Sequence, residues 1–478
     1  MSGEKTYLQD KEVAKASVIE WTGLSPVDAK DRHGKTWHIG GLWFAAQLVP
    51  TALFLGVLGG PSGLGLSYWA AFGAIVLGNV LGAIGPAAMS LTGPKTGLPL
   101  LAQARIPFGR ATGVVGILAA FTSVAFIALG AIFGAEALQV AFGLNPTVAV
   151  LLVFALEGLV SVAGYRVMHL FERTMAIVVA AGFILISAVV IGNLGTVTVS
   201  AAGSSSAGVG SFFLMAAISF GFSFGWAHNA PDYCRYLPAS TSRPKLFWAT
   251  FAGIAVACVW MEILGLTAST MLSQTSPMAA IHALVGGGAI GAFIMIAMYL
   301  GVVANATVAQ YSAGLQILGA GVKLPRPLVT GIVTAFAFAL TIYLQTGNLD
   351  AKFTNVLLLA TYWVAPFIGI WLVLWGRKPN HEAFMKMATT PVAVLHSGRS
   401  PLIALAVGYV AALPFSSTAI GSDLAQSNNP AAILVGSLSR QILDGADLAY
   451  PVGIIVGAIV FGILTRKSSE QPIGNPHE

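Results

Sequence analysis

Long apolar segments are the feature that most restricts the fold of this sequence. A helix that spans a bilayer needs about 20 mostly apolar residues. Twelve segments meet this requirement, at residues 39–58, 68–91, 111–140, 147–164, 174–192, 211–229, 246–268, 285–318, 327–345, 354–376, 401–417 and 449–465. Charged residues make up only 9% of the chain, compared with about 25% in soluble proteins. The sequence therefore predicts an all-α polytopic membrane protein with 12 transmembrane helices.

The basic residues predict how these segments are oriented. Lys and Arg concentrate in the cytoplasmic loops of membrane proteins. If residues 1–38 are a cytoplasmic segment, twelve spans leave only Lys352 and Arg440, among 24 basic residues, on the opposite side. Residues 1–38 also lack the apolar core of a signal peptide. The pattern predicts a multi-pass protein of the inner or plasma membrane with both termini in the cytoplasm. The net charge of +6 follows from these loops and requires no nucleic-acid partner.

Interruptions in two of the segments indicate an internal repeat. The first segment contains Gln47 and Pro50 in its middle, and the sixth contains Gly225 to Asn229. Because the two are five spans apart, the second unit would enter the membrane from the opposite side, as in transporters with inverted repeats. We expect a LeuT-like five-plus-five inverted repeat of residues 39–192 and 193–376. Two extra helices in 377–465 and a cytoplasmic tail at 466–478 would follow. A simple kink at Pro50 is the alternative.

Residues 211–238, with the sequence SFFLMAAISFGFSFGWAHNAPDYCRYLP, indicate where a site lies. The segment begins as an apolar span and then places Trp226, His228, Asn229 and Asp232 at membrane depth. Polar groups there are costly unless they are buried in protein or face water. The alternative is that the helix ends at the surface, with Asp232 and Arg235 as flanking charges.

Other classes of protein find little support in the sequence. Cys234 and Cys258 lack the spacing of a zinc site, and the eight histidines are scattered along the chain. We therefore expect no metal, no cofactor and no enzymatic activity. A channel would need a filter or a ring of charged residues, which the sequence does not contain. These observations favour a transporter, expected to work in the bilayer as a monomeric transport unit.

Four segments then identify a family resemblance. The segment GWAHNAPDYCRYLPASTSRPKLFW, at 225–248, resembles the Asp-Tyr-x-Arg-Tyr-Leu-Pro signature of the nucleobase cation symporter family. That family comprises permeases for cytosine, purines, uracil, thiamine, allantoin and hydantoins, and the purine and cytosine permeases are the most similar branch. DRHG at 31–34, GPKTGLPLLAQARIPFG at 93–109 and NATVAQYSAGLQILG at 305–319 support the resemblance. It implies the five-plus-five fold, with substrate held between spans one, three, six and eight.

The resemblance also implies which residues stack on a substrate. A nucleobase is flat and aromatic, so its binding site needs ring faces. Trp226 matches the family's stacking tryptophan, and Gly225 would let a ligand approach the backbone. The family's sodium-coupled hydantoin transporter has a second tryptophan and a glutamine on helix three, where this chain has Thr122 and Phe126. Phe126 is the candidate opposing face. The structural alternatives are packing for Phe126 and an interfacial position for Trp226.

Amide side chains are the candidates for the rim of the base, which carries hydrogen-bond donors and acceptors. Asn305 corresponds to the family's amide position on helix eight, and Gln310 follows five residues later. That spacing separates them by about 140° around a helix, so both cannot face one ligand unless the helix bends. Gln47 would reach the same cavity from helix one, and His228 would contact substrate or titrate. For Asn305 an interhelical hydrogen bond is the alternative.

The coupling ion is predicted from helices one and eight. Sodium-dependent relatives pair helix-one carbonyls, here those of Ala45 and Leu48, with adjacent hydroxyls on helix eight. Here the hydroxyl positions hold Val303 and Ala304, so a sodium site is expected to be lost unless Thr307, one turn away, restores it. A proton needs only one titratable group. Glu262, in the middle of span seven, is the first candidate, and the others are Glu157, His228 and Asp232.

Together these features predict a secondary active transporter that imports cytosine or purines by proton symport through alternating access. The alternative is a sodium-coupled or proton-coupled transporter of allantoin, uracil, hydantoin or a thiamine precursor, because small changes around a stacking site alter its specificity. At the exit of helix six we expect Asp232 and Arg235 to form an ion pair that locks the cytoplasmic end. Tyr233 and Tyr236 are expected to be anchors at the membrane interface.

Overall fold

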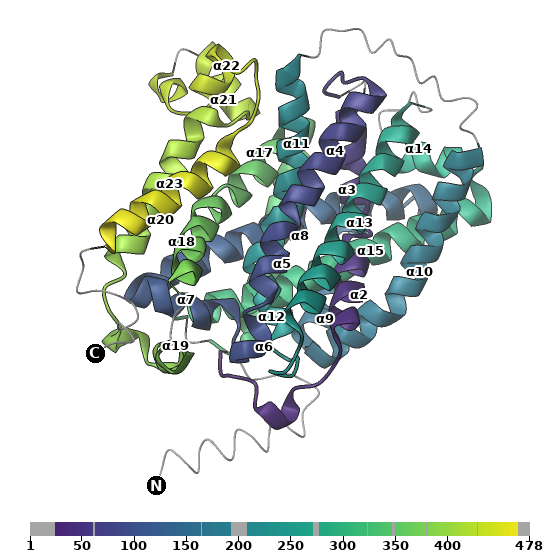
Figure 1. The fold of residues 1–478 in the computed structure, drawn as a ribbon. Coiled ribbons are helices and arrows are strands. Elements are labelled where there is room, and N and C mark those ends of the chain that lie inside the picture. The colour runs from purple at the N-terminus through teal and green to yellow at the C-terminus, as the bar shows by residue number, and fades with distance from the viewer. Residues whose placement is uncertain are drawn as a thin grey trace.

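The computed structural model describes residues 24–60, 63–163, 165–192, 208–270, 277–322, 324–346, 349–377, 381–427 and 429–466. In these parts of the chain all regular structure is helical (Figure 1). Most of the predicted N-terminal segment and nearly all of the predicted C-terminal tail lie outside the described residues.

The helices follow one another without an intervening strand in the described ranges. In chain order they are α2 (Thr36–Gln47), α3 (Pro50–Gly59), α4 (Tyr68–Gly82), α5 (Ile84–Ser90), α6 (Gly93–Thr96), α7 (Leu100–Phe108), α8 (Thr112–Phe142), α9 (Pro146–Ala163), α10 (Tyr165–Gly192), α11 (Val209–Phe224), η4 (Gly225–His228), α12 (Ala230–Cys234), α13 (Arg243–Ser269), α14 (Pro277–Leu284), α15 (Gly288–Gly319), α16 (Arg326–Leu344), α17 (Leu349–Thr361), α18 (Val364–Gly376), α19 (His381–Thr389), α20 (Arg399–Ala412), α21 (Ala419–Gln426), α22 (Ser437–Gln441) and α23 (Ala449–Leu464).

The predicted spans fall on these helices. Among the described residues, eight helices are long and apolar enough to cross a membrane, and two bent helix pairs bring the number to as many as ten. The shorter apolar helices Pro146–Ser161 and Ala449–Leu464 match two further predicted spans. The all-α class is confirmed, whereas the count of twelve crossings and the domain boundaries stay predictions.

The interrupted helices lie inside the bundle. α15 packs along α8, α13 packs along α2 and α3, and α11 packs along α4. In Figure 1 α21 and α22 lie at one end of the bundle, and α6, α12 and α19 lie at the opposite end. We call the end at which α2 begins the N-terminal side.

Glycines let α3 and α13 pack backbone to backbone. A Cβ on Gly56 would lie 1.8 Å from the Glu262 carbonyl oxygen, and a Cβ on Gly265 would lie 1.9 Å from that of Leu53. Neither position accepts a side chain unless the helices separate. Small residues at such close contacts are typical of transmembrane helix pairs.

We expect Gly56→Ala to lower the stability of the folded protein by about 1 to 3 kcal/mol, the usual cost of an overpacked interior. The measurement is thermal unfolding of the purified protein in detergent. Gly331→Ala is the matched control, because a Cβ on this glycine of α16 would meet no atom within 4 Å. Equal unfolding temperatures for the two variants would contradict the close approach of α3 and α13.

Candidate functional site

The first interruption lies where the sequence predicts it. α2 ends at Gln47 and α3 begins at Pro50, and the two helices form a bend of 61°. The Leu48 N–H donates to the Ala45 carbonyl at 3.1 Å, which closes α2 with a tight turn. The Ala46 carbonyl accepts a hydrogen bond from the Asn305 amide of α15 at 2.6 Å. Asn305 therefore joins α15 to the break in helix one, which is the interhelical alternative for this residue.

The second interruption is a change of helix type. α11 passes at Gly225 into the 3₁₀ turn η4, and α12 follows with Pro231 in its first turn. A 3₁₀ stretch inside a longer helix often marks a functional hinge. A Cβ on Gly225 would lie 2.6 Å from the Phe126 ring. Gly225 thus lets an aromatic side chain of α8 lie directly against this hinge.

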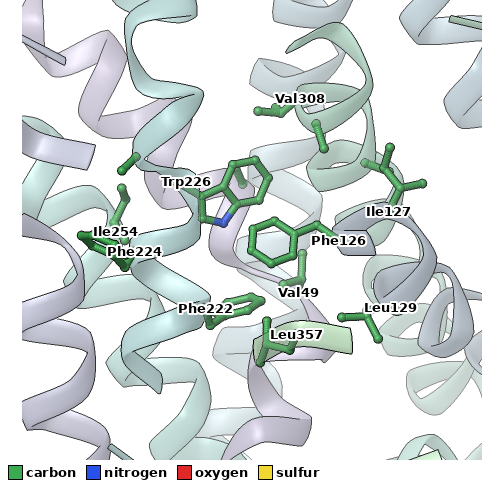
Figure 2. Close-up of a cluster of buried hydrophobic side chains, with 14 of the residues drawn as sticks. Val49, Phe126, Ile127, Leu129, Phe222, Phe224, Trp226, Ile254, Val308 and Leu357 are labelled. Carbon is green, nitrogen blue, oxygen red and sulfur yellow. The ribbon is translucent and has the colours of Figure 1, made fainter. Parts of the chain in front are cut away.

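An aromatic cluster forms at that contact (Figure 2). The Trp226 ring lies 5.2 Å from the Phe126 ring, at an interplanar angle of 41°, and 5.6 Å from the Trp43 ring of α2. Trp226 is fully buried, so it is not an interfacial residue. The structure therefore brings together the two rings predicted from sequence. It adds Trp43, which the sequence analysis missed although it lies one helical turn before Gln47.

Several buried polar atoms at the two interruptions have no hydrogen-bond partner among the described residues. They are the Trp226 indole nitrogen, the Asn229 amide nitrogen and the Gln47 amide nitrogen. The ring nitrogens of His228 approach the Gly225 and Ala119 carbonyls without forming a hydrogen bond of good geometry. Because buried polar groups are nearly always satisfied, these unpaired donors at the two interruptions are candidates for contact with a polar ligand.

A chain of hydrogen bonds connects Asn229, the residue after η4, to α15 and α8. The Gln316 amide nitrogen donates to the Asn229 side-chain oxygen at 2.7 Å, and Ser123 donates to the Gln316 side-chain oxygen at 3.2 Å. Gln316 was not predicted as a site residue. The sequence assigns Gln316 to one face of α15. Its partner, Asn229, is known only from the packing of the helices.

The Thr122 hydroxyl forms its hydrogen bonds with residues of the predicted tenth span and does not point to Trp226. Its hydroxyl donates to the Ala360 carbonyl and accepts from the Trp363 indole nitrogen at 2.8 Å. The Trp363 ring also lies 5.6 Å from the His228 ring. Thr122 therefore helps to hold Trp363 beside η4, a supporting position that the sequence did not indicate.

Asn305 and Gln310, the two candidate amides of the predicted eighth span (α15), face different neighbours, as their spacing predicts. Asn305 binds the break in α2, whereas the Gln310 amide nitrogen donates to Glu157 at 3.1 Å and to Thr334 at 3.0 Å. Gln310 is thus directed toward α9 and α16, and the structure does not bring it together with Trp226.

Glu262 lies in a polar cluster behind helix six. Ser219 donates to one carboxylate oxygen of Glu262 at 2.5 Å. Beside it, Ser223 donates to the Asn79 side-chain oxygen at 2.6 Å. This cluster joins α4, α11 and α13, and its carboxylate is completely buried.

Hydrogen bonds fix the position of α12, the end of the predicted sixth span. The two Asp232 oxygens accept from the Leu100 N–H at 2.8 Å and from the Ser312 hydroxyl at 2.7 Å. Arg235 donates to the hydroxyls of Tyr236 and Tyr311, each at 3.0 Å. Hydrogen bonds to α7 and α15 therefore hold this end of helix six, and the ion pair between Asp232 and Arg235 stays a prediction.

Tyr233 differs from its predicted role as an interface anchor. It is fully buried, because its hydroxyl donates to the Val308 carbonyl and its ring packs against Trp43. The sequence could not separate these roles, since a tyrosine at a helix end suits either environment.

Three of the sequence motifs meet on the N-terminal side. The Arg32 guanidinium donates to the carbonyls of Val27, Pro94 and Thr96. The His33 N–H donates to the Tyr236 carbonyl at 2.7 Å. Burial lowers the pKa of Arg32 from its ordinary value, and nearby Asp28 opposes the shift. The DRHG segment thus links the loop at 93–109 to the exit of helix six.

A cavity of about 1030 Å³ opens on the N-terminal side. We call it the vestibule. Its outer part is lined by exposed residues such as Trp37, and it extends inward to Ala45 at the end of α2. The other lining residues are Val27, Asp31, His33, Gly34, His38, Ile39, Gly41, Leu42, Glu172, Arg173, Ala176, Tyr233, Tyr236 and Leu237. The vestibule therefore leads from the surface to the first interruption.

Comparison with known proteins decides the family. The model of the family described as "Permease for cytosine/purines, uracil, thiamine, allantoin" matches residues 26–453. The chain belongs to this family. It is therefore a multi-pass membrane permease and not an enzyme, as the sequence predicts.

Relatives and solved structures agree with this assignment. Purine-cytosine permease FcyB of Emericella nidulans is 26% identical over 96% of this chain and 91% of its own length. The putative purine-cytosine permease YxlA of Bacillus subtilis is 24% identical over 95% of this chain and 98% of its own length. The transporter MHP1, solved in a closed conformation with bromovinylhydantoin bound, has a TM-score of 0.70 at 16% identity, covering 93% of this chain and 94% of its own. This last likeness confirms the five-plus-five fold.

Proposed function

We propose that this permease imports a nucleobase, cytosine or a purine, together with a proton by alternating access. The observation that carries the substrate class is the buried contact between Trp226 and Phe126 at Gly225. A flat aromatic substrate is recognised by ring faces, and its edge is recognised by groups that donate and accept hydrogen bonds. The unpaired nitrogens of Gln47, Trp226 and Asn229 supply donors in this region. The names of the relatives and of the family support the same class.

The aromatic contact also suggests how the substrate enters. A base held between two rings needs about 3.5 Å on either side, or about 7 Å between the ring planes. The two ring centroids are 5.2 Å apart, so a base does not fit between them as they stand. We infer that Phe126 and Trp226 separate when the substrate binds, and that the 3₁₀ turn η4 is the flexible element.

The surroundings of the first interruption support a proton over sodium. A sodium site needs several oxygen ligands. Here the helix-eight side chain that reaches the break is Asn305, which presents an N–H donor to the Ala46 carbonyl. The hydroxyl of Thr307 donates to the Ala304 carbonyl at 2.8 Å. Val303 and Ala304 offer no side-chain oxygen. The carbonyls of Ala45 and Leu48 are then too few to hold sodium.

The orientation in the membrane belongs to the same proposal. The distribution of basic residues supports a cytoplasmic position for the N-terminal side. The vestibule would then be the cytoplasmic path by which substrate leaves the protein.

The test of the substrate class is competition for uptake. Cells that express the protein take up radiolabelled cytosine or adenine, and unlabelled cytosine, purines, uracil, allantoin, hydantoins and thiamine precursors are added in turn. We expect cytosine or purines to compete at the lowest concentrations. Competition by allantoin or a hydantoin without competition by any nucleobase would reject the proposed substrate and favour the alternative.

Asn305→Ala is expected to reduce the uptake of every competing base by a similar factor. The amide holds the break in helix one, and loss of such a bond to a buried carbonyl costs about 1 to 3 kcal/mol whichever substrate is present. Uptake of several labelled bases by the variant and by the unmodified protein provides the measurement. A loss confined to some bases would instead place the Asn305 amide on the rim of the substrate.

A further inference from the structure

A buried carboxylate that the sequence analysis did not single out lines the vestibule. Segment 174–192 was predicted as span five, but α10 begins at Tyr165, so Glu172 lies two turns inside the helix. Its side chain is 3% exposed. One carboxylate oxygen accepts from the Thr307 hydroxyl at 3.2 Å, and the other has no partner among the described residues.

No ion pair with Glu172 is found among the described side chains around it. The charged or titratable residues that share the vestibule are Asp31, His33, His38, Arg173, Tyr233 and Tyr236. The helices packed against α10 carry other titratable groups, and each of these has its own partner. Glu157 of α9 binds Gln310, and Glu262 of α13 binds Ser219. On α15, Tyr299 binds Leu152 and Tyr311 binds Arg235. Arg243 and Lys245 begin α13. Within the described side chains, none of these groups forms an ion pair with Glu172.

Glu172 is also connected to the interruption between α2 and α3, through α15. The single O–H of Thr307 is shared between Glu172 at 3.2 Å and the Ala304 carbonyl at 2.8 Å. Asn305, two residues earlier on α15, binds the break in α2. Ala45, at the end of α2, lines the same vestibule as Glu172. A change of charge on Glu172 therefore acts where α2, α10 and α15 meet.

We propose that Glu172 carries the transported proton and releases it into the vestibule. In this step the carboxylic acid O–H bond breaks, water accepts the proton, and the carboxylate left behind is stabilised by the Thr307 hydroxyl and by vestibule water. Closure of the vestibule removes that water, and an ionised carboxylate without a cation is costly inside a membrane protein. Glu172 must then be protonated before the closed form is reached, which couples proton binding to alternating access.

Glu262 and Glu157 fit this role less well. Both are completely buried, but neither lines the vestibule. Each is bonded within a cluster of neighbouring helices, Glu262 to Ser219 and Glu157 to Gln310. The inference rests on the proposed proton symport and names the residue that performs it.

The experiment uses the purified full chain in liposomes with an imposed pH gradient. The unmodified protein is expected to accumulate labelled cytosine or adenine by up to about tenfold for each pH unit, the limit for one proton. Glu172→Gln should bring the inside and outside concentrations only to equality, while exchange of labelled for unlabelled base continues. Asp423→Asn, in α21, is the control for loss of a carboxylate outside the site and should accumulate substrate as the unmodified protein does.

The outcomes separate this inference from the proposed function. If the unmodified protein exchanges base but ignores the pH gradient, proton symport itself is rejected. If it responds to the gradient and Glu172→Gln accumulates equally well, Glu172 is not the carrier. Loss of accumulation in Glu262→Gln, with Glu172→Gln unaffected, would transfer the role to Glu262.

A second variant covers the case in which Glu172→Gln does not fold. The Thr307 hydroxyl stabilises the ionised carboxylate, so Thr307→Val should displace the pH profile of uptake to higher pH. An unchanged profile in a folded Thr307→Val protein would overturn the proposal.

Discussion

Uptake by this permease is expected to be indifferent to sodium, to rise as the external pH falls, and to collapse when a protonophore is added. The reason is the composition of the first interruption. The Asn305 amide donates to the Ala46 carbonyl, and an N–H group that faces a carbonyl cannot ligate a cation. Val303 and Ala304 leave helix eight without the two hydroxyls of sodium-dependent relatives. On the proposed proton coupling, the oxygens left at this break are too few for sodium, which needs several.

The measurement compares uptake in sodium and in choline buffers at constant pH, and then across external pH values with and without the protonophore. Concentrative uptake should be abolished by the protonophore while exchange of substrate persists, because exchange needs no net proton movement. Stimulation by sodium at constant pH would reject proton coupling. It would also show that Val303 and Ala304 do not occupy the positions of the sodium-ligating hydroxyls.

Trp226→Ala is expected to weaken substrate binding by about 1 to 3 kcal/mol, the usual worth of stacking a base on an aromatic ring. This corresponds to a loss of affinity of about 5-fold to 150-fold. Trp226→Phe retains a smaller ring face and should lose less. Binding is measured on purified protein by displacement of a labelled base. An unchanged affinity in Trp226→Ala would remove this residue from the site.

A stability control is necessary, because Trp226 is fully buried and packs against Trp43 and Phe126. Truncating a buried tryptophan costs about 3 to 5 kcal/mol of stability in its own right. Trp371 of α18 is also fully buried and has an unpaired indole nitrogen. Trp371→Ala should therefore lower the unfolding temperature without changing the affinity of the folded fraction. An equal loss of affinity in both variants would show that stability accounts for the effect of Trp226→Ala.

The sequence by itself determined the features that depend on local chain chemistry. Continuous apolar segments of about 20 residues form helices in a bilayer, because a helix pairs its backbone groups within the segment. Pro50 and Gly225 marked the two interruptions because each changes what the backbone beside it can do. Trp226 and Phe126 were found because the sequence resembles a family whose stacking positions they match, and both carry the aromatic ring that stacking needs.

Only the tertiary structure decided which groups meet. Helical periodicity separated Asn305 from Gln310 by face, but packing determined that the first binds the break in α2 and the second binds Glu157. The sequence analysis did not identify Trp43, Gln316 or Glu172, because an apolar, amide or acidic residue near a helix end is common. Their importance comes from neighbours far along the chain: Trp226, Asn229 and Thr307. The physical reason is that a hydrogen bond or a ring contact needs two partners within a few ångströms, and a sequence shows only one of them at a time.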